Sequence, residues 1–211
     1  MGGRGASSGG MAGGGNINII STTSLISKEG KPAEINSVLG VLKDVDSQYG
    51  TDSQLSDGQL AKLGKKDHGV MAYYDSQGNL AVNEKYFDTK IMNDAYDKCV
   101  SSGFHPPRGN KSGLEAVAAH EMGHKLTDAA GVKAGAGSWK IDSTADKIVN
   151  EAASSLGYKN TKSFVSKISG YAKHNNAEAV AEAFADVYCN GTKARKESRA
   201  IVKSLNKYFG K

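Results

Sequence analysis

The chain of 211 residues has only two cysteines and three prolines, and it contains no long apolar run. Two cysteines, Cys99 and Cys189, are too few for a disulfide scaffold. We expect both to be free thiols, as is typical of a reducing compartment, although their pairing stays open. No stretch has the apolar length of a secretory signal or a membrane span. These features predict a cytoplasmic protein with no membrane partner, with carriage in a virus particle or delivery by a specialised route as the alternative.

Aromatic residues are also scarce, at 7% of the sequence, and the charge is only weakly one-sided. There are 27 Lys and Arg against 22 Asp and Glu, for a net charge of +5. Several lysines lie near the C-terminus, but no motif of stacking aromatic residues accompanies them, as a nucleic-acid-binding module would have. We therefore interpret the positive charge as a solvated surface and expect no nucleic-acid partner.

Domain organisation follows from composition. Residues 1–15 are Gly-rich and of low complexity, which predicts a flexible tail. This start is similar to those of proteins encoded by phages and mobile elements. Residues 16–211 are long enough for a single domain with a substantial core. Capping and terminating residues predict helices, over the ranges 33–45, 56–63, 145–156 and 193–208.

The most informative motif is His120-Glu121-Met122-Gly123-His124, an HExxH sequence within a stretch typical of a helix. Histidines at positions i and i+4 lie one above the other on one helical face, so both imidazoles can converge on one zinc ion. Glu121 is offset by one residue, and its carboxylate can reach a water bound to that metal. Chance rarely produces this pattern in a chain with five histidines. The motif therefore predicts zinc-dependent peptide hydrolysis rather than two surface histidines.

A capping box precedes the motif. Ser112 can satisfy an early helical N–H group while Glu115, three residues later, reaches back to the backbone of Ser112. No proline follows for many residues, so we expect a helix over 114–130 that Gly131 terminates. The HExxH motif then lies near the middle of a regular helix, where both histidines have fixed directions.

Two further residues of this helix have two interpretations each. Gly123 either lets another backbone approach closely or is simply tolerated at some cost in helix propensity. Asp128 lies on the same face as the histidines. It either accepts a hydrogen bond from the second ring nitrogen of a ligand histidine or is a solvated carboxylate near the helix end.

A catalytic zinc site normally has three protein ligands and one position open to water, so a third ligand is expected from a later element. The range 175–186 is the best candidate, because an asparagine cap and an apolar stripe indicate a helix there. Glu178 and Glu182 are four residues apart on one face of this helix, among alanines. Few other charges accompany them, which favours functional acids over exposed, helix-favouring glutamates.

The string from Tyr171 to Glu178, followed by Ala181-Glu182-Ala183-Phe184, resembles the metal-binding region of the anthrax lethal factor-like zinc metallopeptidases. That group, of the gluzincin type, includes the proline-proline endopeptidases. In this family an HExxH helix is followed, after some tens of residues, by a tyrosine and then by a glutamate seven residues later on a second helix. The resemblance covers residues 114–188 and is specific at these two motifs.

The resemblance implies a Zn²⁺ site whose ligands are His120, His124 and Glu178. It also implies that Glu121 is the general base, that the hydroxyl of Tyr171 stabilises the oxyanion, and that Glu182 is an acid beside the ligands. Zinc lowers the pKa of a bound water to about 7, and Glu121 would take the proton of that water and pass it to the leaving amine. The alternative for Tyr171 is an aromatic anchor that packs its loop.

A β-hairpin is predicted over residues 71–82. Met71–Tyr74 and Asn79–Val82 have strand composition, and a Gly-containing turn joins them. An edge strand of such a hairpin can pair with the main chain of an extended peptide, while an ordinary hairpin that covers a core fits the pattern as well. Together with the helices, it predicts a zincin-like α+β fold, mostly helical, with a small mixed sheet and an edge strand beside the HExxH helix.

The sequence as a whole thus predicts a zinc metalloendopeptidase whose substrate is a protein or peptide. The alternative is a catalytically inactive zincin-like module that binds a partner in a phage particle or a toxin system. Glu121 disfavours this alternative, because a pure binding module needs no general base. A nucleic-acid-associated protein ranks last. The cleavage-site preference and the oligomeric state do not follow from the sequence.

Overall fold

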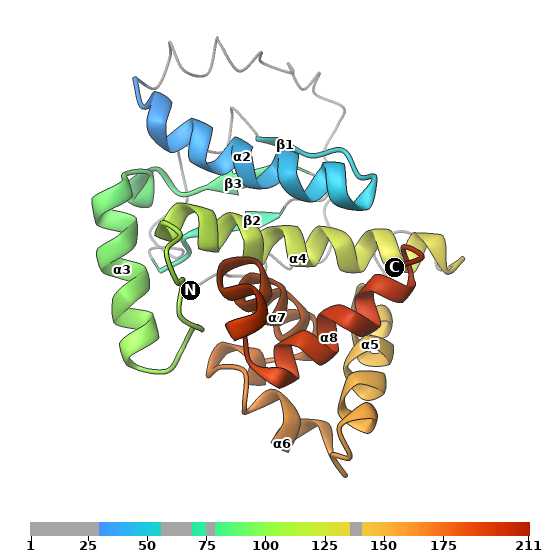
Figure 1. The fold of residues 1–211 in the computed structure, drawn as a ribbon. Coiled ribbons are helices and arrows are strands. Elements are labelled where there is room, and N and C mark those ends of the chain that lie inside the picture. The colour runs from blue at the N-terminus through green and yellow to red at the C-terminus, as the bar shows by residue number, and fades with distance from the viewer. Residues whose placement is uncertain (1–29, 56–68, 75–78, 136–140) are drawn as a thin grey trace, which may run out of the picture.

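The structure is a computed structural model that describes residues 30–55, 69–74, 79–135 and 141–211. A long helix, α4 (Gly113–Lys133), runs through the middle of the molecule (Figure 1). The other α-helices are α2 (Pro32–Tyr49), α3 (Thr89–Ser101), α5 (Ile141–Ser155), α6 (Thr161–Val165), α7 (Asn176–Asn190) and α8 (Lys196–Lys207). The strands are β1 (Gln54–Leu55), β2 (Ala72–Tyr74) and β3 (Asn79–Val82). Short 3-10 helices are η2 (Glu84–Tyr86), η3 (Tyr171–Lys173) and η4 (Gly191–Lys193).

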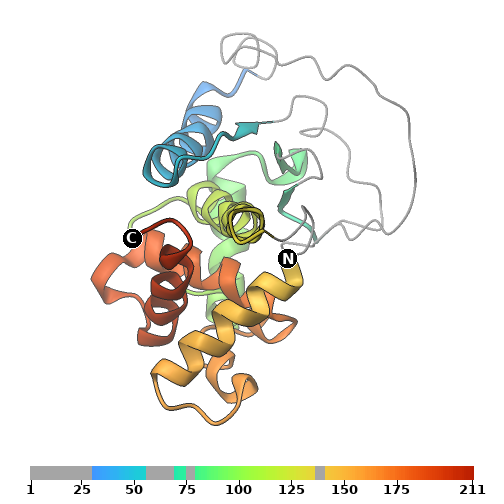
Figure 2. The same cartoon turned by 90° about the vertical axis from the view of Figure 1, so that its right-hand side faces the viewer.

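Helix α4 separates two layers. Figure 2 views α4 nearly end-on, with α2 and the strands on one side of it and α5, α7 and α8 on the other. Direct packing against α4 comes from α2, α3, α5, α7 and β2. A helix that is covered in this way has no solvated face, and nearly all of its side chains from Leu114 to Thr127 are buried. The middle of α4 is therefore the centre of the core.

The sheet is small and mixed, in the order β1-β3-β2. The central strand β3 pairs in parallel with β1, where Gln54 lies opposite Asn79. It pairs antiparallel with β2, where Ala72 lies opposite Val82 and Tyr74 opposite Leu80. Among the described strands β2 pairs with β3, and it packs against α4.

The start of α4 has the predicted capping box. The backbone N–H of Glu115 donates to Ser112 Oγ at 3.2 Å, and the backbone N–H of Ser112 donates to Glu115 Oε2 at 2.8 Å. The predicted stop at Gly131 is wrong, because the helix continues to Lys133. Gly131 is buried, so packing maintains the helix there. At this end of α4 the chain turns at Gly135, two residues after the helix ends, where φ is 77°.

Most of the expected elements are present, with shifted boundaries. Helices α2, α5 and α8 contain most of the residues predicted over 33–45, 145–156 and 193–208, although 3-10 helix η4 occupies the start of the last range. The two strands of the predicted hairpin are β2 and β3. The predictions for the tail, for the helix 56–63 and for the turn Asp75–Gly78 lie outside the described residues.

The described residues are therefore mostly helical, with one small mixed sheet, as an α+β architecture requires. Among them, no helix combines the length and the apolar character that crossing a membrane demands. The sequence did not predict helix α3 as a whole. Both cysteines, Cys99 and Cys189, are free thiols in the structure.

Candidate metal centre

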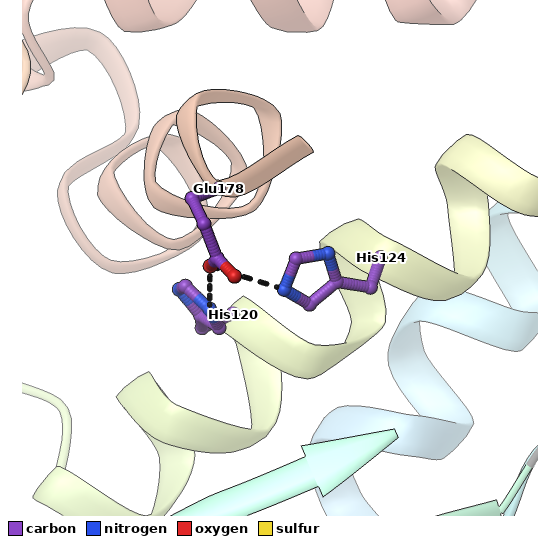
Figure 3. Close-up of side chains that lie close together, drawn as sticks. All are labelled: His120, His124 and Glu178. Carbon is purple, nitrogen blue, oxygen red and sulfur yellow. Dashed lines mark ion pairs between the residues drawn. The ribbon is translucent and has the colours of Figure 1, made fainter. Parts of the chain in front are cut away.

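Helices α4 and α7 bring three metal-ligating side chains together. His120 and His124 project from α4 toward Glu178, which comes from the first turn of α7 (Figure 3). One atom from each of the three residues lies within 4.8 Å of the other two. Glu178 Oε2 is 3.2 Å from His120 Nε2 and 3.3 Å from His124 Nε2. The three side chains therefore converge on one point between the two helices.

This convergence is unusual in its hydrogen bonding. Among the described residues, the buried side-chain atoms without a hydrogen-bond partner are His120 Nε2, His124 Nδ1 and Glu178 Oε2. Two of these atoms point at the common centre, where they approach each other closely without the alignment of a hydrogen bond. Buried polar atoms are normally satisfied, so atoms aimed at one point and left unsatisfied fit a cation that they would coordinate. Two imidazoles and one carboxylate form a donor set that suits Zn²⁺.

The helix start holds Glu178 in place. The side chain of Asn175 caps α7 and accepts a hydrogen bond from the backbone N–H of Glu178 at 2.8 Å. Burial alone would raise the pKa of Glu178, but the neighbouring histidines lower it well below its usual value. Burial would likewise lower the pKa of His120, but the carboxylates of Glu178 and Glu182 raise it well above its usual value. Opposite charges on the two helices thus stabilise the centre when no metal is bound.

Glu182 lies one turn after Glu178 and contacts a ligand directly. Its Oε1 is 2.8 Å from His120 Nδ1, and its Oε2 accepts a hydrogen bond from Ser169 Oγ at 2.6 Å. Burial opposes ionisation of Glu182, but His105 and His120 outweigh it and lower the pKa to about 2. The carboxylate is therefore ionised and fixes the ring of His120 so that Nε2 faces Glu178.

Glu121 is buried on the side of α4 that faces the sheet. The backbone N–H of Tyr74, at the end of β2, donates a hydrogen bond to its carboxylate. Burial raises the pKa of Glu121, which brings the carboxylate closer to the range of an efficient general base. Glu121 and His120 also line a small pocket with apolar walls that include Met71 and Val117. The acid of the HExxH motif thus lies beside both His120 and the end of β2.

Tyr171 lies in η3, which packs against α7. Its ring stacks on that of His120, with centroids 5.7 Å apart and planes 28° apart. Its hydroxyl lies near Glu178, and burial raises its pKa well above the usual value. The hydroxyl therefore keeps its proton at neutral pH and can act as a donor next to the three ligands. The structure thus places Tyr171 at the centre, as well as in the packing of its loop.

Asp128 was expected to accept a hydrogen bond from the second ring nitrogen of a ligand histidine, and the structure shows no such bond for His120 or His124. The Nδ1 atom of His120 contacts Glu182, and that of His124 has no hydrogen-bond partner. Asp128 is half-exposed near the end of α4. The physical reason is that Glu182, one turn along α7, approaches His120 from the neighbouring helix.

Three contributors to the site were missed or undervalued in the sequence. His105 is buried, and its Nδ1 lies 2.9 Å from Glu182 Oε1. Ser169 bonds the other oxygen of Glu182, and the backbone of Tyr74 bonds Glu121. His105 and Glu182 are 77 residues apart in the chain. No local pattern links residues at such a separation, so only the fold identifies the contact.

Comparison of the chain with protein-family models, with curated proteins and with solved structures finds no match. What the centre can do is therefore inferred from its own residues.

Proposed function

We propose that the protein is a zinc-dependent endopeptidase with a zincin-like arrangement of its site. The observation that carries this proposal is the convergence of His120, His124 and Glu178, with Glu121 buried beside them. A structural metal site needs no additional acid, whereas a hydrolytic one needs a base next to the metal. Glu121 therefore favours an enzyme over a module that only binds a partner.

Three ligands from two helices would hold the zinc ion. They leave a fourth position for water, as catalytic zinc sites do. When bound, zinc supplies Lewis acidity, which polarises a carbonyl and makes water acidic enough to lose a proton near neutral pH. Glu182 orients His120, and Asn175 fixes the first turn of α7 behind Glu178. The second helix thus both contributes a ligand and aligns another.

Glu121 is the general base in this proposal. Its carboxylate accepts the proton of the attacking water and then delivers that proton to the nitrogen of the leaving amine. Its raised pKa suits both steps, because the group must take up a proton and release it again at a pH near neutrality. The backbone of Tyr74 lies beside this carboxylate and favours its charged form.

Tyr171 supplies a hydrogen-bond donor to the developing oxyanion. The hydroxyl lies beside Glu178 in a buried position, where a hydrogen bond to a negative oxygen is stronger than in water. The raised pKa of Tyr171 keeps the donor protonated. Glu121 and Tyr171 both lie beside the ligand cluster, Glu121 next to His120 in the sequence and Tyr171 with its ring on that of His120. A peptide bond held there would have a base and a hydrogen-bond donor within the same site.

The substrate in this proposal is a protein or peptide. Strand β2 packs against α4, and its last residue, Tyr74, lies beside Glu121. The end of β2 is therefore close to the proposed base, and a peptide that reaches this base passes near it.

Mass-spectrometric profiling of a diverse peptide library tests the proposal. The zinc-loaded protein should cleave peptides internally, lose this activity on treatment with a chelator and regain it when zinc is added back. Matched samples of Glu121→Gln exclude a contaminating protease. Folded, zinc-loaded protein that cleaves no member of a broad library would contradict the proposal and favour a module that binds a partner.

A further inference from the structure

A single oxygen atom of Glu182 is shared by two histidines. His120 Nδ1 and His105 Nδ1 lie 2.8 Å and 2.9 Å from Glu182 Oε1. His105 comes from the loop between α3 and α4, and its side chain is 5% exposed. This histidine contributes no atom to the cluster of ligands. It is thus a third imidazole beside the centre that the proposed reaction does not use.

The direction of both hydrogen bonds follows from the geometry of the contact. One oxygen atom, Glu182 Oε1, meets both ring nitrogens, and Glu182 Oε2 already accepts from Ser169 Oγ, so the carboxylate is the acceptor and each Nδ1 the donor. Both Nδ1 atoms must therefore carry the proton. For His120 this selects the tautomer in which Nε2 has a lone pair facing Glu178, the form that binds a metal.

Other contacts hold His105 firmly. Its ring is stacked on that of Tyr96 in α3, with centroids 5.2 Å apart and planes only 7° apart. Tyr96 is itself buried, and its hydroxyl donates to the carbonyl oxygen of Pro106 at 3.2 Å. The imidazole of His105 therefore has little freedom to turn, and its Nδ1 is a fixed donor to Glu182.

The backbone next to His105 also holds the segment that contains Tyr171. The N–H of Gly170 donates to Gly103 O at 2.8 Å, and the N–H of Tyr171 donates to Phe104 O at 3.0 Å. A Cβ on Gly170 would lie 3.2 Å from Phe104 Cα, which shows how closely the two segments approach. The short loop that contains Phe104 and His105 thus contacts both Glu182 and the segment that contains Tyr171.

We propose that His105 is a positioning residue of the metal centre, which fixes Glu182 so that Oε1 meets His120 Nδ1 and keeps His120 in its metal-binding tautomer. The inference rests on the proposed metal site. His105 does not touch the metal or the substrate in this role. Its loss leaves Glu182 Oε1 with one donor instead of two, and the position of this oxygen against His120 is then less firmly fixed, although Ser169 still holds Oε2.

Two nearly isosteric substitutions test this role. In His105→Asn, the amide nitrogen can take the place of Nδ1 and still donate to Glu182. In His105→Gln, the amide nitrogen corresponds to Nε2 and points away from Glu182. Zinc affinity is measured by competition with a chelating indicator, and the visible spectrum of the Co²⁺-loaded protein reports the ligand geometry. We expect His105→Asn to stay within about threefold of the wild type and His105→Gln to bind zinc about tenfold more weakly, with altered Co²⁺ bands.

The same pair in a Glu182→Ala background shows whether His105 acts through Glu182. We expect the difference between the Asn and Gln variants to disappear there. Equal zinc affinities of the Gln variant and the wild type, or an Asn–Gln difference that persists without Glu182, would overturn the inference. If a variant does not fold, ¹⁵N spectra of the unaltered zinc-loaded protein decide. Protonated Nδ1 atoms on both His105 and His120 support the role, and an unprotonated His105 Nδ1 contradicts it.

These measurements separate the two proposals. A wild-type protein that binds no zinc refutes the proposed metal site itself. Zinc binding by the wild type without a difference between the two variants refutes only the role of His105. Neither readout depends on a peptide substrate.

Discussion

Gly123 of α4 and Ala181 of α7 meet where the two helices cross. A Cβ on Gly123 would lie 2.7 Å from Ala181 Cα, and 3.2 Å from the Cβ of Phe184. Real Cβ atoms essentially never come within 3.0 Å of such an atom. Gly123 carries only a hydrogen atom where other residues have a Cβ, and this allows α7 to approach α4 so closely. Glu178, one turn before Ala181, reaches the histidines because of this approach.

Replacement of Gly123 by alanine should force the helices apart. The neighbouring atom is backbone rather than the end of a flexible side chain, so the clash cannot be relieved by a rotamer change. We expect Gly123→Ala to lower the free energy of unfolding by about 1–3 kcal/mol, as overpacking of a core does, and to weaken zinc binding. Thermal unfolding and titration with zinc measure the two effects.

Gly40→Ala is the matched control. Gly40 lies in the interior of α2, is exposed, and a Cβ there would meet nothing within 4 Å. Alanine should stabilise this helix by about 0.4–1 kcal/mol and leave zinc binding unchanged. If Gly123→Ala proves as stable as Gly40→Ala, close approach of the helices is not what Gly123 provides.

The sequence predicted most directly those residues of the site that lie a few positions apart in the chain. The histidines of the HExxH motif are four residues apart, so helix geometry alone puts them on one face. Glu178 and Glu182 stood out as functional acids from the pattern of their helix, and the resemblance to a family assigned their roles and that of Tyr171. The structure brings all three to the histidines.

The parts that the sequence did not predict depend on contacts between distant segments. His105 and Glu182 are 77 residues apart, and the parallel pairing of β1 with β3 has no local signal. The choice between two interpretations of Gly123 likewise required the position of α7. The predicted stop at Gly131 was wrong because burial outweighs the low helix propensity of glycine.

Zinc affinity should depend on pH through His120. Its pKa is raised well above the usual value by the two carboxylates, against the effect of burial. Zinc requires the deprotonated ring, so protons compete with the metal. Glu178, with a lowered pKa, stays ionised and does not compete. We expect the affinity to keep rising above pH 7, by up to about tenfold per pH unit for one displaced proton.

A series of zinc titrations between pH 5.5 and about 9, corrected for the buffer and for hydroxide, measures this dependence. An ordinary histidine would be deprotonated above a pH of about 6.5, and the affinity would then level off. A plateau that begins near pH 6.5 would show that the carboxylates do not hold the proton on His120.

Cys189 should react slowly with alkylating reagents. Burial raises the pKa of its thiol from 9.0 to about 12. Since the thiolate is the reactive form, its population at pH 8 falls by about a thousandfold relative to an ordinary cysteine. Peptide mapping after timed treatment with iodoacetamide should show slow labelling of Cys189 in the native protein and fast labelling in urea. Equal rates in the two states would contradict the burial of this thiol.

Tyr171→Phe removes the donor and keeps the aromatic ring. If the hydroxyl stabilises the oxyanion, kcat should fall by about 10²–10³-fold with little change in KM, as for the loss of a single oxyanion donor. Zinc content and thermal stability should remain close to those of the wild type, because the ring still packs on His120. A variant that retains full kcat would leave Tyr171 with the packing role alone.

The most direct test of the central claim is a side-by-side measurement of peptide cleavage and bound zinc in the wild type and in Glu121→Gln. The substitution keeps the size of the side chain and the three ligands, but it removes the base. We predict that both proteins bind one equivalent of zinc and that cleavage falls by at least about 10²–10⁴-fold in the variant. Cleavage by Glu121→Gln at the wild-type rate, with zinc still bound, would contradict the assignment of this centre as a peptidase site.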